Sequence, residues 1–272
     1  MSTLLRPQQR EAFITEVTAY YQQHGRSMPW RENTDPYYVL VSEIMLQQTQ
    51  VHRVRPKFEA FIGQFPTIMS LAQSPLSEVL RAWSGLGYNR RAKFLHQAAK
   101  EIVAMHDGRI PQDFGALTDL PGIGPNTAGA IMVYAFNQPV VFIETNVRSV
   151  FMHHFFSGKD RVADTELRPF IEQTIDHNNP REWYWALMDY GSYIKKRGLG
   201  KITASKHYAK QSQFEGSVRQ LRGRILKQLT DTTLSYEELD VGLADERLPV
   251  VLRALVKEGL IAEKSGSYCL VD

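Results

Sequence analysis

The chain has 272 residues, 43% of them hydrophobic and 22% charged, with a formal net charge of +3. This length fits one or two domains with a sizeable core, and the composition excludes a largely disordered chain. No uncharged apolar run of about 20 residues occurs, which excludes a membrane-spanning helix. Met1 to Arg10 lacks the apolar stretch of a secretory signal, and the one cysteine, Cys269, excludes internal disulfides. We therefore expect a cytoplasmic protein.

Up to about residue 195 the apolar residues recur at helical spacing, and strand-like alternation is almost absent. Prolines at first turns and clusters of Gly, Pro and Asn mark the ends of the periodic segments. The pattern predicts helices over 10–23, 36 to about 51, 56–64, 67–71, 76–84, 90–105, 114–118, 126–136, 146–156, 165–175 and 180–195. We find no internal repeat and no low-complexity tract in the chain.

From Gly198 to Gly216 the periodicity is lost and small, polar and basic residues dominate, which predicts a linker. Between Lys195 and Arg224 nine Lys or Arg residues accompany a single acid, Glu215. Such a surplus is able to neutralise several phosphates and would make binding strongly dependent on salt. A solvated basic linker is the alternative, and charge alone leaves both open.

The residues after this linker predict a second, smaller unit. Helices are expected over 218–229 and 245–258, and the run Ser235 to Glu238 has the pattern of a capping box that starts another. Residues 260–271 predict a β-hairpin. Three helices followed by a hairpin resemble a winged helix.

The run 120–129, Leu-Pro-Gly-Ile-Gly-Pro-Asn-Thr-Ala-Gly, joins the end of one predicted helix to the start of the next. Gly122 and Gly124 allow backbone conformations that are closed to residues with side chains. The N–H groups at the start of the second helix form a natural seat for a phosphate. We favour this phosphate seat over the alternative, a tight structural turn between two helices.

Two acids have environments that predict opposite protonation states. Glu43 lies within one helical turn of Leu40, Ile44 and Leu46, so desolvation would raise its pKa and keep it protonated. Glu144 lies where a helix begins, and the helix dipole favours its ionised form by about 0.3–1 kcal/mol. Taken singly, a structural hydrogen-bonding carboxylate and an ordinary N-cap acid are the alternatives. Together, one neutral and one charged acid suit the cleavage of a glycosidic bond through an oxocarbenium-like state.

Six segments give residues 8–195 a family resemblance. They are Met28–Arg31, Ser42–Val51, Trp83–Tyr88, Leu120–Thr127, Glu144–Val147 and Leu187–Gly191. In this order they resemble the helix-hairpin-helix DNA glycosylases, and most of all the bacterial adenine glycosylases of the MutY type. The resemblance implies a mainly α, two-lobed fold whose cleft receives a nucleotide flipped from double-stranded DNA.

The resemblance also implies roles for single residues. Glu43 would protonate the departing base, and Glu144 and Asn126 would complete the catalytic set. The base pocket would be lined by Arg26, Trp30, Arg31, Leu46 and Asp189. Gln48 and Tyr88 would fill the gap that the flipped nucleotide leaves in the duplex. The hairpin residues Gly122, Gly124 and Thr127 would grip a phosphate, together with a monovalent cation held by backbone carbonyls.

The chain departs from the family pattern in four places. Asn126 stands where the glycosylase/lyases carry a lysine nucleophile, which predicts a monofunctional enzyme because no Schiff base can form. Glu144 stands where the family has an aspartate, and such a shift of a carboxylate by roughly an ångström can cost ~100-fold in rate. The four cluster cysteines are absent, so we expect no iron–sulfur cluster, and Lys195, Lys196 and Arg197 lead into the linker instead.

The fourth departure is the C-terminal region, where the family's large oxoguanine-sensing domain is replaced by residues 216–272. We therefore predict a glycosylase domain over 1–197, a basic linker over 198–216 and a winged-helix-like domain over 217–272. His153 and His154 are adjacent on a helix and have no evident third ligand, so no metal held by side chains is expected.

The predicted function is that of a monofunctional DNA N-glycosylase, acting as a monomer on double-stranded DNA without a required cofactor. Mispaired adenine is the default base. The alternatives are a pyrimidine glycosylase acting on cytosine, uracil or thymine, and a catalytically silent protein that binds DNA structure. In a bacterium, the protein is expected near the nucleoid.

Overall fold

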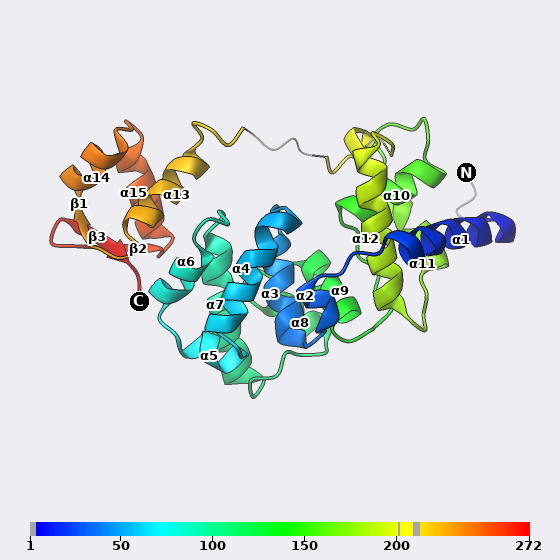
Figure 1. Ribbon diagram of the computed structural model, residues 1–272, viewed down its shortest axis with the longest axis horizontal. Helices are drawn as coiled ribbons and strands as arrows, with labels where there is room; N and C mark the ends of the chain where they lie inside the picture. The colour runs from blue at the N-terminus through cyan, green and yellow to red at the C-terminus, as the bar shows by residue number, and fades with distance from the viewer. Residues whose placement is uncertain (1–3, 201, 209–212) are drawn as a thin grey trace. The chain divides into compact units, whose positions relative to one another are not determined.

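The computed structural model describes residues 4–200, 202–208 and 213–272, and Lys201 and Lys210 of the basic run lie outside the described residues. The mainly α fold class is confirmed (Figure 1). The elements are α1 (Pro7–His24), α2 (Pro29–Glu32), α3 (Pro36–Leu46), α4 (Val51–Gln64), α5 (Ile68–Gln73), α6 (Leu76–Trp83), α7 (Arg90–Met105), α8 (Phe114–Asp119), α9 (Pro125–Tyr134), α10 (Thr145–Phe155), α11 (Asp164–Thr174), α12 (Pro180–Lys196), the 3₁₀ helix η1 (Ile202–Ala204), α13 (Val218–Gln228), β1 (Leu234–Ser235), α14 (Tyr236–Leu243), α15 (Leu248–Lys257), β2 (Ile261–Lys264) and β3 (Ser267–Leu270). None of the helices in the described ranges is long and apolar enough to cross a membrane.

Contacts divide the described residues into two compact units. Unit 1 comprises described residues of Met1–Val39, Gln112–Phe114 and Gly124–Lys210. Unit 2 comprises those of Leu40–Pro111, Gly115–Ile123 and Gln211–Asp272. The predicted domain boundaries at residues 197 and 217 concern a different division of the chain and stay a prediction.

Unit 1 is built around α12, against which α1 and α10 pack. Phe13 of α1 lies 5.2 Å from Phe151 of α10 and 6.0 Å from Trp183 of α12, measured between ring centroids. Gly191 allows α10 and α12 to approach closely, because a Cβ at this position would lie 2.5 Å from the carbonyl oxygen of Asn146. This packing sets the late residues of α12 beside the first turn of α10.

The helical part of unit 2 packs α5 and α6 on α7. Trp83 is fully buried at the end of α6, with its ring 6.0 Å from that of Phe61. Its indole N–H donates to the carbonyl of Gly87 at 3.2 Å. The core of this unit therefore supports the turn between α6 and α7.

The C-terminal part of unit 2 has the element order expected of a winged helix, with one short additional strand. Ser235 and Glu238 form the predicted capping box at the start of α14. Strands β2 and β3 form the predicted hairpin, and the sheet order is β1-β3-β2. The two-residue turn of this hairpin, Ser265 and Gly266, has positive φ at both positions (52° and 78°). Such turns are favoured in hairpins because their backbone twist matches that of the two strands.

Boundaries of three predicted helices are wrong. The helix from Pro36 ends at Leu46, not near residue 51, and the next begins at Val51, not at Pro56. Gln48 has a φ of 54°, a left-handed conformation that cannot continue a right-handed helix. The last predicted helix begins at Leu248, not at residue 245, because the Asp245 side chain accepts the Arg247 amide and forms a turn instead.

Candidate active site

The helix-hairpin-helix turn lies between α8 and α9, as predicted. Gly122 has a φ of 77°, and a Cβ there would lie 2.7 Å from the Cβ of Phe94. Gly124 is the N-cap of α9, with Pro125 in the first turn, and the first helical bond joins the Ala128 amide to the Gly124 carbonyl at 2.9 Å. The amides at such a helix start favour an anion. Asn126 and Thr127 belong to this first turn.

The buried Asp189 forms an ionic cluster with two arginines in unit 1. Arg31 donates to both Asp189 carboxylate oxygens at 2.9 Å, and the Arg26 side chain and amide donate to them at 2.6–2.8 Å. Burial alone raises the pKa of Asp189, but the hydrogen bonds and the charge of Arg31, together with the hydrogen bonds of Arg26, hold this pKa below its usual value. Asp189 is therefore an anion whose oxygens orient two guanidinium groups.

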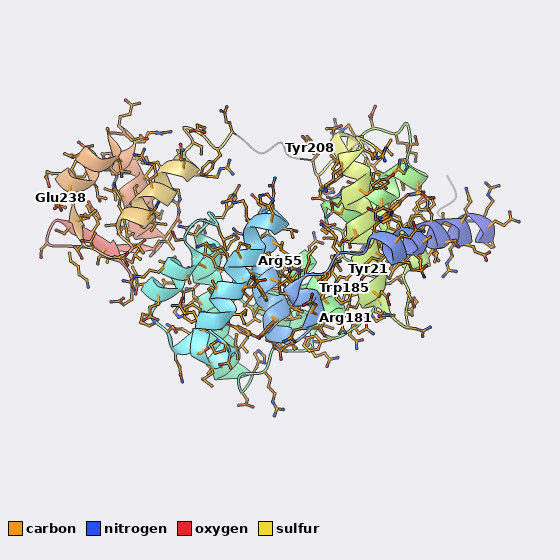
Figure 2. The ribbon with its side chains drawn as sticks, in the orientation of Figure 1. Tyr21, Arg55, Arg181, Trp185, Tyr208 and Glu238 are labelled. Carbon is orange, nitrogen blue, oxygen red and sulfur yellow. The ribbon has the colours of Figure 1, made fainter. Side chains whose placement is uncertain are left out.

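An aromatic ring lies over one arginine of this cluster. The Arg31 guanidinium lies 5.6 Å from the ring centroid of Trp185, which Figure 2 labels on α12. Trp30, on the short helix α2, is only 6% exposed. Three of the five predicted pocket residues, Arg26, Arg31 and Asp189, thus contact one another directly. Trp30 precedes Arg31 in the same helix.

Glu144 is the N-cap of α10, and its longer side chain still closes the cap. One carboxylate oxygen accepts the amides of Asn146 and Val147 at 2.6 and 2.9 Å. Burial raises the pKa of Glu144, although these two donors and the charges of Lys195 and Arg148 lower it. The direction is thus opposite to the one that the helix start alone predicts, because desolvation outweighs the dipole.

Asn126 contacts the residue that precedes this acid. Its side-chain oxygen accepts the amide of Ile143 at 3.3 Å, one residue before Glu144. The Asn146 side chain, which donates to Glu144, also lies 3.8 Å from the sulfur of Met188, the neighbour of Asp189. Unit 1 therefore gathers Asn126, Glu144 and the segment that carries the ionic cluster.

The other predicted site residues belong to unit 2. Glu43 and Leu46 lie in α3 and are partly exposed, while Ile44 and Met45 between them are buried. Gln48 and Tyr88, the predicted duplex-filling residues, both have left-handed backbones, with φ of 54° and 50°. Residues with side chains adopt this conformation rarely, so both turns hold their side chains in directions that a regular helix does not offer.

Arg91, a buried arginine that the sequence pattern did not single out, joins these two turns. Its guanidinium donates to the carbonyls of Ile44, Met45 and Gln47 at 2.5–2.9 Å and to that of Gly87 at 3.1 Å. Burial lowers the pKa of Arg91 to about 10. The signal in the sequence was an arginine on the apolar side of a predicted helix.

Arg91→Met is expected to lower the free energy of unfolding by about 3 kcal/mol, because several buried carbonyls lose their donor. Arg91→Lys keeps the charge but offers fewer donors, and we expect a smaller loss. Urea unfolding of both variants measures these losses. A loss below about 0.5 kcal/mol for Arg91→Met would show that water replaces the guanidinium.

Lys195, Lys196 and Arg197 are exposed at the end of α12, and the Arg197 guanidinium lies 5.3 Å from the ring of Tyr193. The predicted linker that follows holds η1, and the Val162 amide donates to the carbonyl of Ala204 at 2.9 Å. These contacts hold part of the linker against unit 1.

The adjacent histidines are involved in aromatic packing. His153 and His154 have ring centroids 4.9 Å apart, and the His154 ring lies 3.1 Å from the Tyr190 hydroxyl. Burial lowers the pKa of His154. Over the described ranges, no group of three or more His, Cys, Asp or Glu residues gathers as a metal site would require.

Comparisons with known proteins agree with these motifs. A family described as "HhH-GPD superfamily base excision DNA repair protein" matches residues 41–172, which hold Glu43, the hairpin and Glu144. The chain is 33% identical over 278 residues to the adenine DNA glycosylase of Mycolicibacterium smegmatis, covering 94% of each protein. It is 38% identical over 186 residues to that of Buchnera aphidicola subsp. Acyrthosiphon pisum, covering 67% of this chain and 53% of the relative.

The fold is also similar to a solved structure. A thermostable thymine-DNA glycosylase matches with a TM-score of 0.62 and 25% identity, over 69% of this chain and 88% of that one.

Proposed function

The chain belongs to the HhH-GPD superfamily of base excision DNA repair proteins, and we propose that it is a monofunctional DNA N-glycosylase that releases mispaired adenine from double-stranded DNA. The observation that carries the substrate is the identity of 33% to an adenine DNA glycosylase over 94% of both chains. The product is an abasic site. The enzyme acts as a monomer, in the compartment that holds the genome.

The proposed chemistry divides the work between two acids. Glu43 protonates the departing base, which makes it a better leaving group. Glu144, as an anion, stabilises the oxocarbenium-like sugar and orients the attacking water. The buried setting of Glu144 strengthens its interaction with a developing positive charge, since the local dielectric is low.

The base itself is read by groups in unit 1. Asn126 offers an amide that donates and accepts together, which suits the edge of a base. Because the Asn126 side chain has no nucleophilic amine, the reaction uses water and forms no Schiff base. Asp189 holds Arg26 and Arg31 in fixed directions, so that both guanidinium groups present donors in the same geometry at each turnover.

DNA is held mainly through its backbone in this proposal. The start of α9 receives a phosphate, with a monovalent cation on the hairpin carbonyls, and Gln48 and Tyr88 enter the duplex where the nucleotide leaves. Lys195, Lys196 and Arg197 add phosphate contacts. The iron–sulfur cluster common in this family needs four thiolates, and this chain has one cysteine, Cys269, so its residues do not fit the cluster.

A pyrimidine is the second candidate base. The thymine-DNA glycosylase that shares this fold is 25% identical to the chain. Glu144 replaces the aspartate of the family pattern, and both Glu144 and Asn126 belong to the catalytic set in this proposal. A longer acid would leave less room in the base pocket, which would suit a smaller base.

The test is a panel of duplexes that carry each base, normal or damaged, opposite every partner, 8-oxoguanine included. We expect released adenine and alkali-labile abasic sites, and no covalent complex after borohydride treatment. Release of a pyrimidine alone would replace adenine by the second candidate. Tight binding without any released base would leave a silent DNA-binding protein, and a borohydride-trapped complex would contradict the monofunctional assignment.

A further inference from the structure

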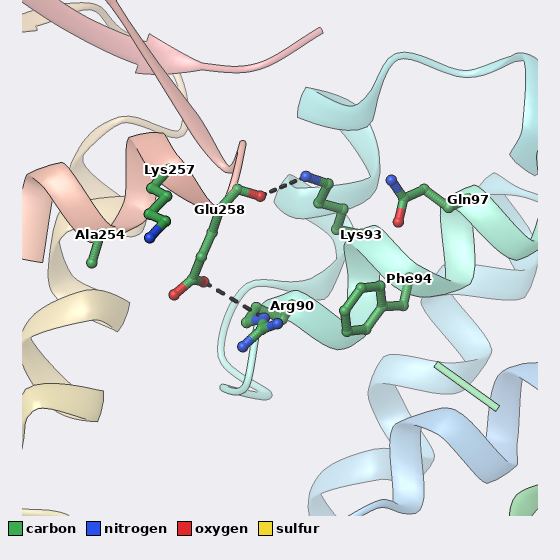
Figure 3. Close-up of a pocket in the computed structure, with 7 residues that line it drawn as sticks. All are labelled: Arg90, Lys93, Phe94, Gln97, Ala254, Lys257 and Glu258. Carbon is green, nitrogen blue, oxygen red and sulfur yellow. Dashed lines mark hydrogen bonds and ion pairs between the residues drawn. The ribbon is translucent and has the colours of Figure 1, made fainter. Parts of the chain in front are cut away.

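The C-terminal helices of unit 2 are fixed on α6 and α7 by ionic and polar contacts. Arg222 of α13 pairs with both carboxylate oxygens of Glu258 at 2.6 and 3.0 Å. The Glu258 carbonyl accepts Lys93 of α7 at 2.5 Å, and its carboxylate lies 3.9 Å from the Arg90 side chain (Figure 3). Arg90, Lys93 and Glu258 border a cavity of about 500 Å³ that Phe94 also lines.

Two further hydrogen bonds join α6 to the C-terminal part of unit 2. Arg81 of α6 donates to the carbonyl of Thr230 at 2.6 Å, and the Ser77 hydroxyl donates to the Asp272 side chain at 2.7 Å. Contacts at several separate points restrict rotation as well as translation. The first turn of α13 therefore has a defined position beside the turn that joins α6 to α7.

Arg219, in that first turn of α13, reaches Tyr88. Its guanidinium donates to the Tyr88 hydroxyl and lies 5.4 Å from the centroid of the Tyr88 ring. The Arg91 guanidinium also lies 5.4 Å from this ring. One phenol is thus contacted by an arginine of its own helical lobe and by an arginine of the C-terminal region.

The backbone around Tyr88 needs such support. Gly85, Gly87 and Tyr88 all have positive φ, at 90°, 74° and 50°. Two glycines leave this turn many alternative conformations, and the left-handed conformation is unfavourable for a tyrosine. Hydrogen bonds from a cationic donor and cation–π contacts are stronger than neutral contacts, so they can select one orientation of the ring.

We propose that Arg219 is a positioning residue, through which the C-terminal region holds the Tyr88 ring in the orientation that enters the duplex. This inference rests on the proposed function, which gives Tyr88 its place in the DNA. The C-terminal region then contributes to nucleotide flipping without reading a base. Arg219 acts through Tyr88 and touches no reacting atom.

The test compares Arg219→Ala, Tyr88→Phe and the double variant, in the full chain. Tyr88→Phe keeps the ring but removes the acceptor hydroxyl. We expect each single variant to slow single-turnover excision by about tenfold, with duplex affinity within about threefold of the wild type. The double variant is expected to be no slower than the slower single one, because both changes remove the same contact. Flipping is followed separately by the fluorescence of 2-aminopurine beside the target base.

The matched control is Lys227→Ala, which removes one exposed cation from the same helix, two turns further on. It is expected to behave like the wild type. Additive losses in the double variant would overturn the proposal, and so would a loss that lies wholly in duplex affinity, since Arg219 would then be a phosphate contact.

A measurement on the free protein separates this inference from the proposed function. Hydrogen exchange of the amides at 85–88 should quicken in Arg219→Ala and stay unchanged in Lys227→Ala. Unchanged exchange in Arg219→Ala would overturn the positioning role. If exchange is faster in Arg219→Ala but the wild-type protein releases no base from any duplex, the contact between Arg219 and Tyr88 stands and the proposed function is wrong.

Discussion

Glu43→Gln is expected to lower the single-turnover rate of base release by about 1,000-fold or more, while duplex affinity stays within about threefold. The amide has the size of the carboxyl group and lacks a transferable proton, so the leaving base departs unprotonated. Rapid-quench assays with excess enzyme measure the rate, and fluorescence anisotropy measures the affinity.

The matched control for this change is Glu59→Gln, which removes an exposed carboxylate of the same unit, paired with Arg55 on α4. It should leave excision near the wild-type rate. If Glu43→Gln retains turnover within about tenfold, another group supplies the proton and the acid role assigned to Glu43 is wrong.

Glu144→Gln should have the second largest effect, a loss of about 100-fold or more in excision. A neutral amide still accepts the two amides that cap α10, so the fold is retained, but it cannot stabilise a sugar cation. In the wild type, activity is expected to fall in acid as Glu144 becomes protonated. Because the pKa of Glu144 is raised, this fall should occur at a higher pH than for an ordinary glutamate. A pH–rate profile under single-turnover conditions measures this loss of activity at acid pH.

The same substitution makes an opposite prediction for stability. A carboxyl group whose pKa is raised by folding stabilises the fold below its unfolded-state pKa, and this contribution is lost as the pH rises through the folded-state pKa. Near neutral pH, Glu144→Gln is therefore expected to melt above the wild type, and the difference should shrink as the pH falls. Thermal melts at several pH values, with Glu172→Gln as the exposed control, measure it. A variant that melts below the wild type near neutral pH would show that the anion is stabilised by its surroundings.

Much of the helical architecture could be predicted from local sequence. The helix over 90–105 has the predicted bounds, because an apolar stripe and clear breakers at both ends define it. The capping box at Ser235 and the C-terminal hairpin are likewise set by neighbours in the chain. The hairpin between α8 and α9 follows from two glycines and a proline whose backbone requirements are specific.

The rest depends on partners distant in sequence. The end of α3 is fixed by Arg91, more than 40 residues away, and no local pattern at 46–51 indicates this. The direction of the Glu144 pKa depends on burial among segments that the sequence does not place together. The contact between Arg219 and Tyr88 joins residues 131 positions apart, and a basic run gives no hint of which arginine will find an aromatic acceptor.

The Arg91 guanidinium serves the turns at both Gln48 and Tyr88, and this shared donor has a mechanical consequence. Neither turn can tilt without stretching hydrogen bonds from the guanidinium that also holds the other turn, so the two turns are expected to move together. Entry of the two side chains into a base stack would then be concerted, and half-inserted states would be sparsely populated.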